Sequence, residues 1–152
     1  MQSKEHWEKV YTTKVPDNVS WFQPHAETSM RLIHNAGLGH DAVIIDVGGG
    51  ASTLVDDLLD DGYRALTVLD LSGAALDESR RRLGVKGESV RWMEADITQA
   101  EFENDSFDIW HDRAVFHFLT TDEDRKAYVK QVLRALKPGG HVIMATFGSN
   151  GP

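Results

Sequence analysis

The run from Val43 to Ser52 constrains this chain more than any other segment, because it reads as a buried strand that ends in a glycine turn. Gly48 to Gly50 lack β-carbons, so the backbone can turn tightly there and a ligand can approach the main-chain amides at the start of the next helix. Asp46 would repel a pyrophosphate at that position and would attract a positively charged group. The segment predicts a nucleotide-like ligand that carries positive charge, and it argues against a dinucleotide.

Apolar strand patterns alternate with helical patterns along the remainder of the chain. Helices are expected at Ser52 to Asp60, at Gly73 to Leu83, and after a Thr120-x-x-Glu123 capping box as far as Pro138-Gly139-Gly140. Strands are expected at Ala42 to Val47, Ala65 to Leu69, Val90 to Met93, Phe107 to His111 and His141 to Phe147. This order predicts a doubly wound, Rossmann-like α/β fold whose mostly parallel sheet has helices on both faces. In the last helix, the side chains expected to face inward are Tyr128, Val132, Leu133 and Leu136.

Length and composition limit the class of protein. The 152 residues fit a single domain. The net charge of −8 disfavours nucleic acid as a partner, and the absence of cysteine excludes disulfides and thiolate metal sites. No apolar run is long enough for a bilayer, and Met1 to Glu8 lack the apolar core of a secretion signal. We therefore expect no membrane association and, by default, a cytoplasmic location.

Two further acids follow strands at positions suited to a nucleoside. Asp70 comes about twenty residues after the glycine turn, where an acid in this architecture accepts hydrogen bonds from ribose hydroxyls. Capping of the helix that follows is the alternative role for Asp70. Asp96 can accept a hydrogen bond from an exocyclic amine such as that of adenine, and capping of its own loop is the alternative.

Taken together, Asp46 with its glycines, Asp70, the Asp96-Ile97 pair and the Leu136 to Gly140 segment resemble the ordered motifs of the class I S-adenosylmethionine-dependent methyltransferases. The resemblance extends from about Val43 to Phe147, with Ser52 in place of the usual third glycine. It implies S-adenosylmethionine as cofactor, S-adenosylhomocysteine as product, and no metal. The cofactor-binding residues that it implies are Asp46, Gly48, Gly49 and Gly50 for the methionine part, Asp70 and Leu71 for the ribose, and Asp96 and Ile97 for the adenine.

Candidates on the substrate side follow the fourth strand, because ligands sit beyond the carboxyl ends of strands in open parallel sheets. His111, Asp112 and Arg113 are the candidate catalytic residues, and His111 is also expected to line the cofactor pocket. Asp112 and Arg113 can instead pair with each other or cap the next segment. His117, beside two phenylalanines, is more typical of a packed histidine than of a base.

Residues 1–40 are expected to form a helical lid over a core of residues 41–152, with Tyr11 and Trp21 contacting the cofactor or else filling the core. Members of the family usually continue with another helix and two strands. The C-terminal strands are therefore expected to be missing, and the exposed sheet edge could pair with a second copy of the chain.

The function expected from these features is methyl transfer to a small molecule, and methylation of protein lysine is the nearest alternative. The Asp112-Arg113 pair is similar to motifs of both enzyme types, the thiopurine type and the protein-lysine type, and does not choose between them. A nicotinamide-dependent oxidoreductase is the rival of another class, although Asp46 and Thr53 argue against it. A non-catalytic cofactor-binding domain is the remaining alternative.

Overall fold

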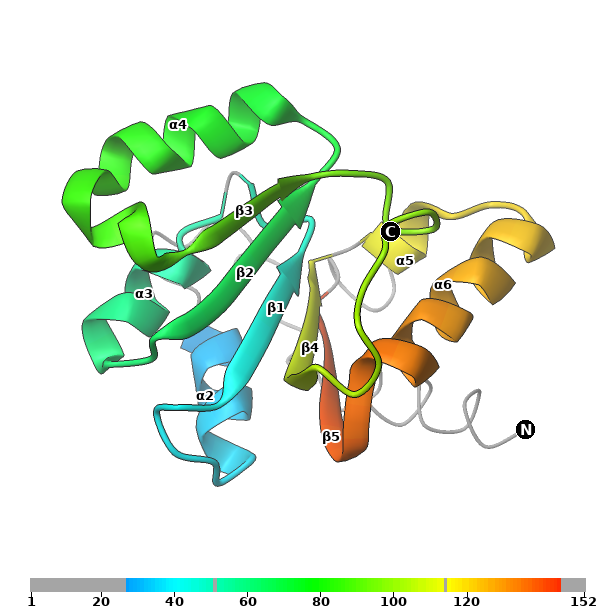
Figure 1. The fold of residues 1–152 in the computed structure, drawn as a ribbon, viewed down its shortest axis with the longest axis horizontal. Coiled ribbons are helices and arrows are strands. Elements are labelled where there is room, and N and C mark those ends of the chain that lie inside the picture. Colours follow the sequence, from blue (N-terminus) through cyan, green and yellow to red (C-terminus); the bar gives the residue numbers. More distant parts are fainter. Residues whose placement is uncertain (1–26, 51, 114, 146–152) are drawn as a thin grey trace.

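The structure, a computed structural model, describes residues 27–50, 52–113 and 115–145. Within them a five-stranded sheet has the order β3-β2-β1-β4-β5, and every neighbouring pair of strands is parallel (Figure 1). The strands are β1 (Val43–Val47), β2 (Ala65–Asp70), β3 (Arg91–Glu94), β4 (Phe107–Arg113) and β5 (Leu136–Ala145). The predicted doubly wound, Rossmann-like fold is confirmed.

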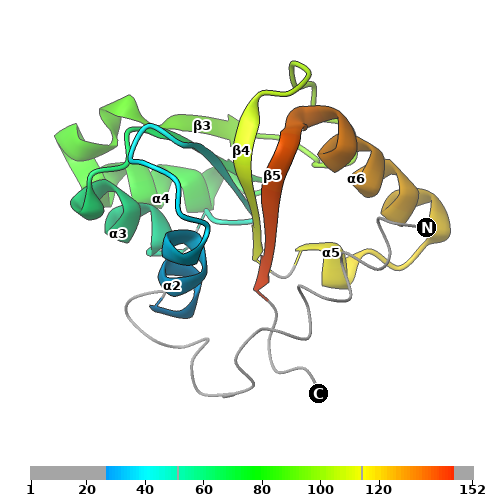
Figure 2. The same cartoon turned by 90° about the horizontal axis from the view of Figure 1, so that it is seen from below.

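Helices cover both faces of the sheet, as Figure 2 shows. On one face lie α2 (Glu27–Asn35), α3 (Leu54–Asp61) and α4 (Gly73–Leu83), which is followed by the 3-10 helix η2 (Gly84–Ser89). On the other face lie α5 (Val115–Phe118) and α6 (Asp122–Ala135). Each face encloses its own core of buried apolar side chains. The two layers bury the sheet from both sides, as a parallel sheet requires.

Hydrogen bonds to terminal backbone groups set where the helices begin and end. The Ser72 hydroxyl accepts from the amide of Ala75 at 3.1 Å and begins α4. Gly62 ends α3 with φ of +109°, a conformation that glycine adopts without strain. At α6 the cap is Thr121, whose hydroxyl accepts from the amide of Asp124. The capping box predicted at Thr120 is therefore wrong by one residue.

The α6 to β5 segment departs from prediction in two ways. The sequence predicts that Leu133 faces the core, but its side chain is 65% exposed. Leu133 lies about 140° around the helix from the buried Tyr128, whereas Val132 follows Tyr128 by about one turn and shares its face. The helix ends at Ala135, close to the predicted stop. However, Leu136 to Gly140 belongs to β5, with a register shift before the residue pair Ile109 and His141.

The order of the strands reverses at β1. From there the chain proceeds outward to β2 and β3 on one side, and β4 and β5 occupy the other side. Open α/β sheets bind ligands in the crevice next to such a reversal, at the carboxyl ends of the two strands on either side of it. The register places Asp46 of β1 directly beside His111 of β4 at this position. The switch point therefore contains two of the chemically distinctive residues of the sequence.

Candidate functional site

The turn after β1 is tied to β2 and fits only glycine at its first position. Gly48 has φ of +80°, and its amide donates to the carbonyl of Leu69 at 2.7 Å. A β-carbon at Gly48 would come within 2.3 Å of a methyl group of Val115 in α5. Both the backbone conformation and the close approach of α5 therefore exclude a side chain here.

Asp70, at the end of β2, lies against the glycine turn. The Gly50 amide donates to Asp70 Oδ2 at 2.9 Å, and the Ser72 amide donates to Asp70 Oδ1 at 2.9 Å. A β-carbon at Gly50 would lie 2.8 Å from Asp70 Oδ2. Asp70 thus organises the turn and the start of the next helix. Each of its oxygens keeps a further lone pair, so the predicted ribose contact fits this geometry and stays a prediction.

Asp46 is buried at the other side of the turn, with an exposed fraction of only 2%. Its Oδ1 lies 2.8 Å from Nδ1 of His111. Its Oδ2 has no hydrogen-bond partner among the residues that the structure describes. A β-carbon at Gly49 would come within 2.1 Å of this oxygen, so the unpaired atom lies directly against the turn. A buried carboxylate oxygen without a donor is costly, and a cationic or hydrogen-bond-donating ligand group would remove that cost.

His111 is fully buried, and both of its ring nitrogens are engaged. Nε2 lies 2.7 Å from the hydroxyl of Ser29, a buried residue of α2, and Nδ1 lies beside Asp46. A general base must present a nitrogen to the substrate, and His111 presents none in this arrangement. The geometry favours a role for His111 in holding Asp46. His111 contacts Oδ1 of Asp46, whereas the turn lies against Oδ2 of the same side chain. His111 is therefore separated from the turn by Asp46, and its predicted contact with the cofactor stays a prediction.

Asp112 faces the opposite side of the sheet from His111, since successive side chains of a strand alternate. Its carboxylate accepts from the amides of Val115 at 2.6 Å and Phe116 at 3.0 Å, and from the hydroxyl of Tyr128. The Tyr128 hydroxyl in turn accepts from Nε1 of Trp110 at 2.8 Å. Burial raises the pKa of Asp112 to about 6, and these hydrogen bonds partly oppose the rise. Asp112 therefore caps α5, which agrees with the structural alternative.

The remaining predicted residues fall into three groups. Asp96 Oδ1 accepts from both the amide and the hydroxyl of Thr98, which matches the loop-capping alternative, and the adenine contact stays a prediction. Ile97 is buried in the core on the α6 face, whereas Leu71 is 71% exposed next to Asp70. Arg113 is half-buried at the end of β4. Tyr11 and Trp21 lie outside the described residues, as does the side chain of His117.

Sequence reasoning missed Ser29 and the hydrogen bonds of Tyr128. Ser29 precedes Ile33 by four residues, so both lie on the same face of α2, and both are buried. The sequence does contain a signal for this contact, because a small polar residue on the apolar face of a helix needs a buried hydrogen-bond partner. Within the described residues no three histidine, cysteine or carboxylate side chains gather closely enough to hold a metal ion. None of the described helices has the length and apolar character needed to cross a membrane.

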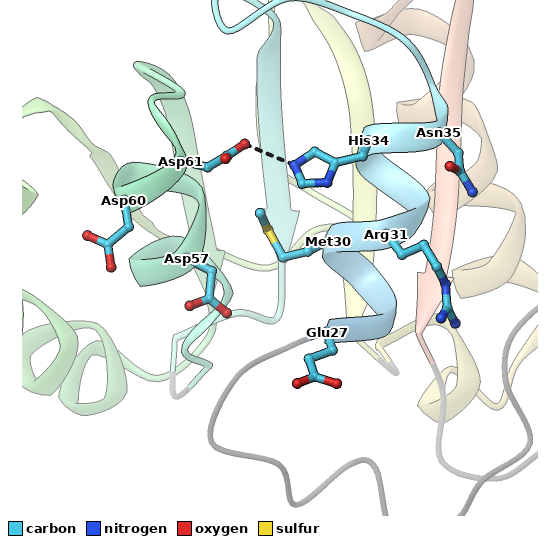
Figure 3. A pocket seen from close by; sticks show the side chains of 8 residues that line it. All are labelled: Glu27, Met30, Arg31, His34, Asn35, Asp57, Asp60 and Asp61. Atoms are coloured by element: carbon cyan, nitrogen blue, oxygen red, sulfur yellow. Dashed lines mark hydrogen bonds and ion pairs between the residues drawn. The ribbon is translucent and has the colours of Figure 1, made fainter.

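A separate groove of about 610 Å³ lies between α2 and α3 (Figure 3). Acidic side chains dominate it, and Nε2 of His34 lies 2.9 Å from Asp61 Oδ2, a contact that lowers the pKa of Asp61. The residues that line the groove are Glu27, Met30, Arg31, His34, Asn35, Asp57, Asp60 and Asp61. None of them belongs to the glycine turn or to the predicted cofactor contacts. The groove is therefore not the candidate site.

Comparison with known proteins gives consistent results. The family described as a methyltransferase domain matches residues 44–140. The eEF1A lysine and N-terminal methyltransferase of Bos taurus is 27% identical over 141 residues, which are 93% of this chain and 20% of that protein. The malonyl-(acyl-carrier protein) O-methyltransferase of Paenibacillus sp. (strain JDR-2) is 27% identical over 131 residues, which are 82% of this chain and 46% of that protein. The chain thus spans about a fifth of the eEF1A relative and about half of the second.

A solved structure shares the fold. Phosphoethanolamine N-methyltransferase 1 of Haemonchus contortus, in complex with phosphoethanolamine and S-adenosylhomocysteine, superposes with a TM-score of 0.64 at 16% identity. The match covers 94% of this chain and 31% of that one. At this identity the likeness concerns the arrangement of strands and helices alone.

Proposed function

Because this chain belongs to the methyltransferase domain family of the class I S-adenosylmethionine-dependent methyltransferases, we propose that it binds S-adenosylmethionine at the glycine turn and transfers the methyl group to a small molecule. One observation carries the proposal. The buried Oδ2 of Asp46, which has no hydrogen-bond partner within the described residues, lies against a turn whose glycines leave no room for side chains. An amino-acid ammonium group is the kind of donor that would satisfy that oxygen.

The residues around the turn fit the cofactor. Asp46 supplies an acceptor for the methionine part, and the turn from Gly48 to Gly50 supplies close access to the backbone. Asp70 would accept from the ribose hydroxyls, and the exposed Leu71 would cover an apolar face of the nucleoside. The acidic character of the pair Asp46 and Asp70 agrees with a ligand that carries positive charge at physiological pH.

When bound, S-adenosylmethionine supplies an activated methyl group on a sulfonium sulfur, which an acceptor nucleophile takes in an in-line displacement. The residues of the chain then have to orient the two reactants and exclude water. The strand β4 ends at the half-buried Arg113, which follows Asp112, the residue that caps α5. Because Asp112 is fully buried whereas Arg113 is partly exposed, Arg113 is the stronger candidate of the two for contact with an acceptor.

Protein methylation is the second candidate function. A relative that aligns with 93% of this chain is named as a methyltransferase of eEF1A lysine and N-terminus, whereas another is named for a malonyl group on acyl-carrier protein. Small-molecule methylation remains the first proposal. The protein alternative calls for a direct test, because both chemistries use a nucleophile that is aligned with the same donor.

Two measurements test the proposal. Calorimetry with S-adenosylmethionine, S-adenosylhomocysteine and NAD should give binding of the first two and none of NAD. Binding of NAD alone would contradict the assignment of the ligand. Transfer of label from methyl-labelled cofactor should then be followed in parallel into the low-molecular-weight fraction of an extract and into purified eEF1A. Label in the small-molecule fraction supports the first proposal, and label in eEF1A alone supports the second.

A further inference from the structure

A hydrogen-bonded chain of three buried residues connects α2 to the acid of the glycine turn. The Ser29 hydroxyl is 2.7 Å from Nε2 of His111, and Nδ1 of His111 is 2.8 Å from Asp46 Oδ1. The exposed fractions are 4% for Ser29 and 0% for His111. The three side chains come from α2, β4 and β1, so tertiary folding alone brings them together. Such a chain fixes the rotation of each member.

Among the described residues, none donates a hydrogen bond to Oδ2 of Asp46, the remaining oxygen of this hydrogen-bonded series. A carboxylate can rotate about its terminal bond unless one oxygen is held. Here His111 holds Oδ1, so Oδ2 is fixed against the turn at Gly49. The rotation of the imidazole is itself fixed by Ser29 at the opposite nitrogen.

We propose that Ser29 and His111 are positioning residues that hold the Asp46 carboxylate in the orientation that receives the ammonium group of the cofactor. The inference rests on the proposed function. In this arrangement the Ser29 hydroxyl donates to Nε2, and Nδ1–H donates to Asp46 Oδ1. Both ring nitrogens of His111 are then engaged by Ser29 and Asp46, and Oδ2 of Asp46 is left to face the ligand. The same contacts link α2 to the cofactor site, although α2 contributes none of the predicted cofactor-binding residues.

The test separates positioning of Asp46 from general damage by using two ligands. S-adenosylhomocysteine carries the amino-acid ammonium group, whereas 5′-methylthioadenosine has the same nucleoside without it. For Ser29→Ala we expect affinity for S-adenosylhomocysteine to fall about five- to tenfold and affinity for 5′-methylthioadenosine to stay within about twofold of the wild type. Thr28→Ala, on the preceding residue of α2, is the matched control and should leave both affinities unchanged.

A double-mutant cycle provides the second readout. If Ser29 acts through Asp46, Ser29→Ala should have no further effect on S-adenosylhomocysteine affinity in an Asp46→Asn background. Nitrogen NMR of the wild-type His111 ring should show a protonated Nδ1 and an unprotonated Nε2, and this measurement needs no variant to fold. An unprotonated Nδ1, which could not donate to Asp46, would overturn the proposal.

The remaining outcomes are also decisive. Equal loss of both ligands in Ser29→Ala, no loss of either, or a full effect that persists beside Asp46→Asn would each refute the positioning role. Failure of the wild-type protein to bind S-adenosylhomocysteine at all would refute the proposed function itself. The two failures are therefore distinguishable from one set of titrations.

Discussion

Replacement of Asp112 by asparagine should change how the stability of the protein depends on pH. Asp112 is fully buried, and burial raises the pKa of its carboxyl from 3.8 to about 6 in the folded protein. The folded state therefore binds the proton more tightly than the unfolded state. The stability that this difference contributes is fully present below the unfolded value of 3.8 and is lost as the pH rises through about 6.

The size of the effect follows from the two pKa values. The difference between 3.8 and about 6 corresponds to about 3 kcal/mol of unfolding free energy, at about 1.4 kcal/mol for each pKa unit. The asparagine side chain of the variant would have no titrating group, and its single oxygen could still accept from the amide of Val115. Between about pH 4 and about pH 7 the wild type should therefore lose most of this difference, about 2 kcal/mol, relative to Asp112→Asn.

Urea unfolding of both proteins at several pH values measures this quantity, because other groups that titrate in the range contribute equally to the two curves. Asp77→Asn, at an exposed position of α4, is the matched control and should run parallel to the wild type. Parallel curves for wild type and Asp112→Asn would refute the reasoning. They would mean that the hydrogen bonds from Tyr128 and the α5 amides offset the cost of burial completely.

The remaining predictions concern the turn and the helix α6. Gly49→Ala should abolish calorimetric binding of S-adenosylhomocysteine, because its β-carbon would come within 2.1 Å of Asp46 Oδ2; unchanged binding would place the ligand elsewhere. Asp70→Ala should weaken that binding by about 1 to 3 kcal/mol, and an unchanged affinity would leave Asp70 with its capping role alone. Val132→Ala should lower the unfolding free energy by about 1 to 3 kcal/mol in urea titrations, whereas Leu133→Ala should change it by less than about 0.5 kcal/mol. Equal losses at these two neighbours would contradict the orientation of α6.

The sheet and its order of elements could be predicted because each strand and helix carries its own local pattern. The apolar run before Gly48 and the glycine at position 62 are examples, since turn and cap conformations depend on a few adjacent residues. The sequence predicts Thr120 as the cap of α6, whereas the cap is Thr121, because each of these threonines is followed three residues later by an acid. Local sequence alone did not separate these two equivalent starts.

The candidate site was predicted less completely, for two physical reasons. The sequence predicts a fourth strand that ends at His111, with Asp112 and Arg113 just beyond it. The strand continues to Arg113, and alternation then sends His111 and Asp112 to opposite faces. The partner of His111 lies 82 residues away in α2, a distance that no local pattern bridges. Residues of the turn were identifiable from spacing, whereas the residues that hold them required the tertiary structure.

The position of α2 has a practical consequence for dissecting this protein. The stretch matched by the family begins at residue 44, after α2 has ended at Asn35. A shortened version cut at that boundary would lose Ile33, which belongs to the same buried core as Ile44 and Ile143, and would leave Nε2 of His111 without the Ser29 hydroxyl. Such a fragment should express poorly, and any inactivity that it displayed would say nothing about the chemistry of the intact chain.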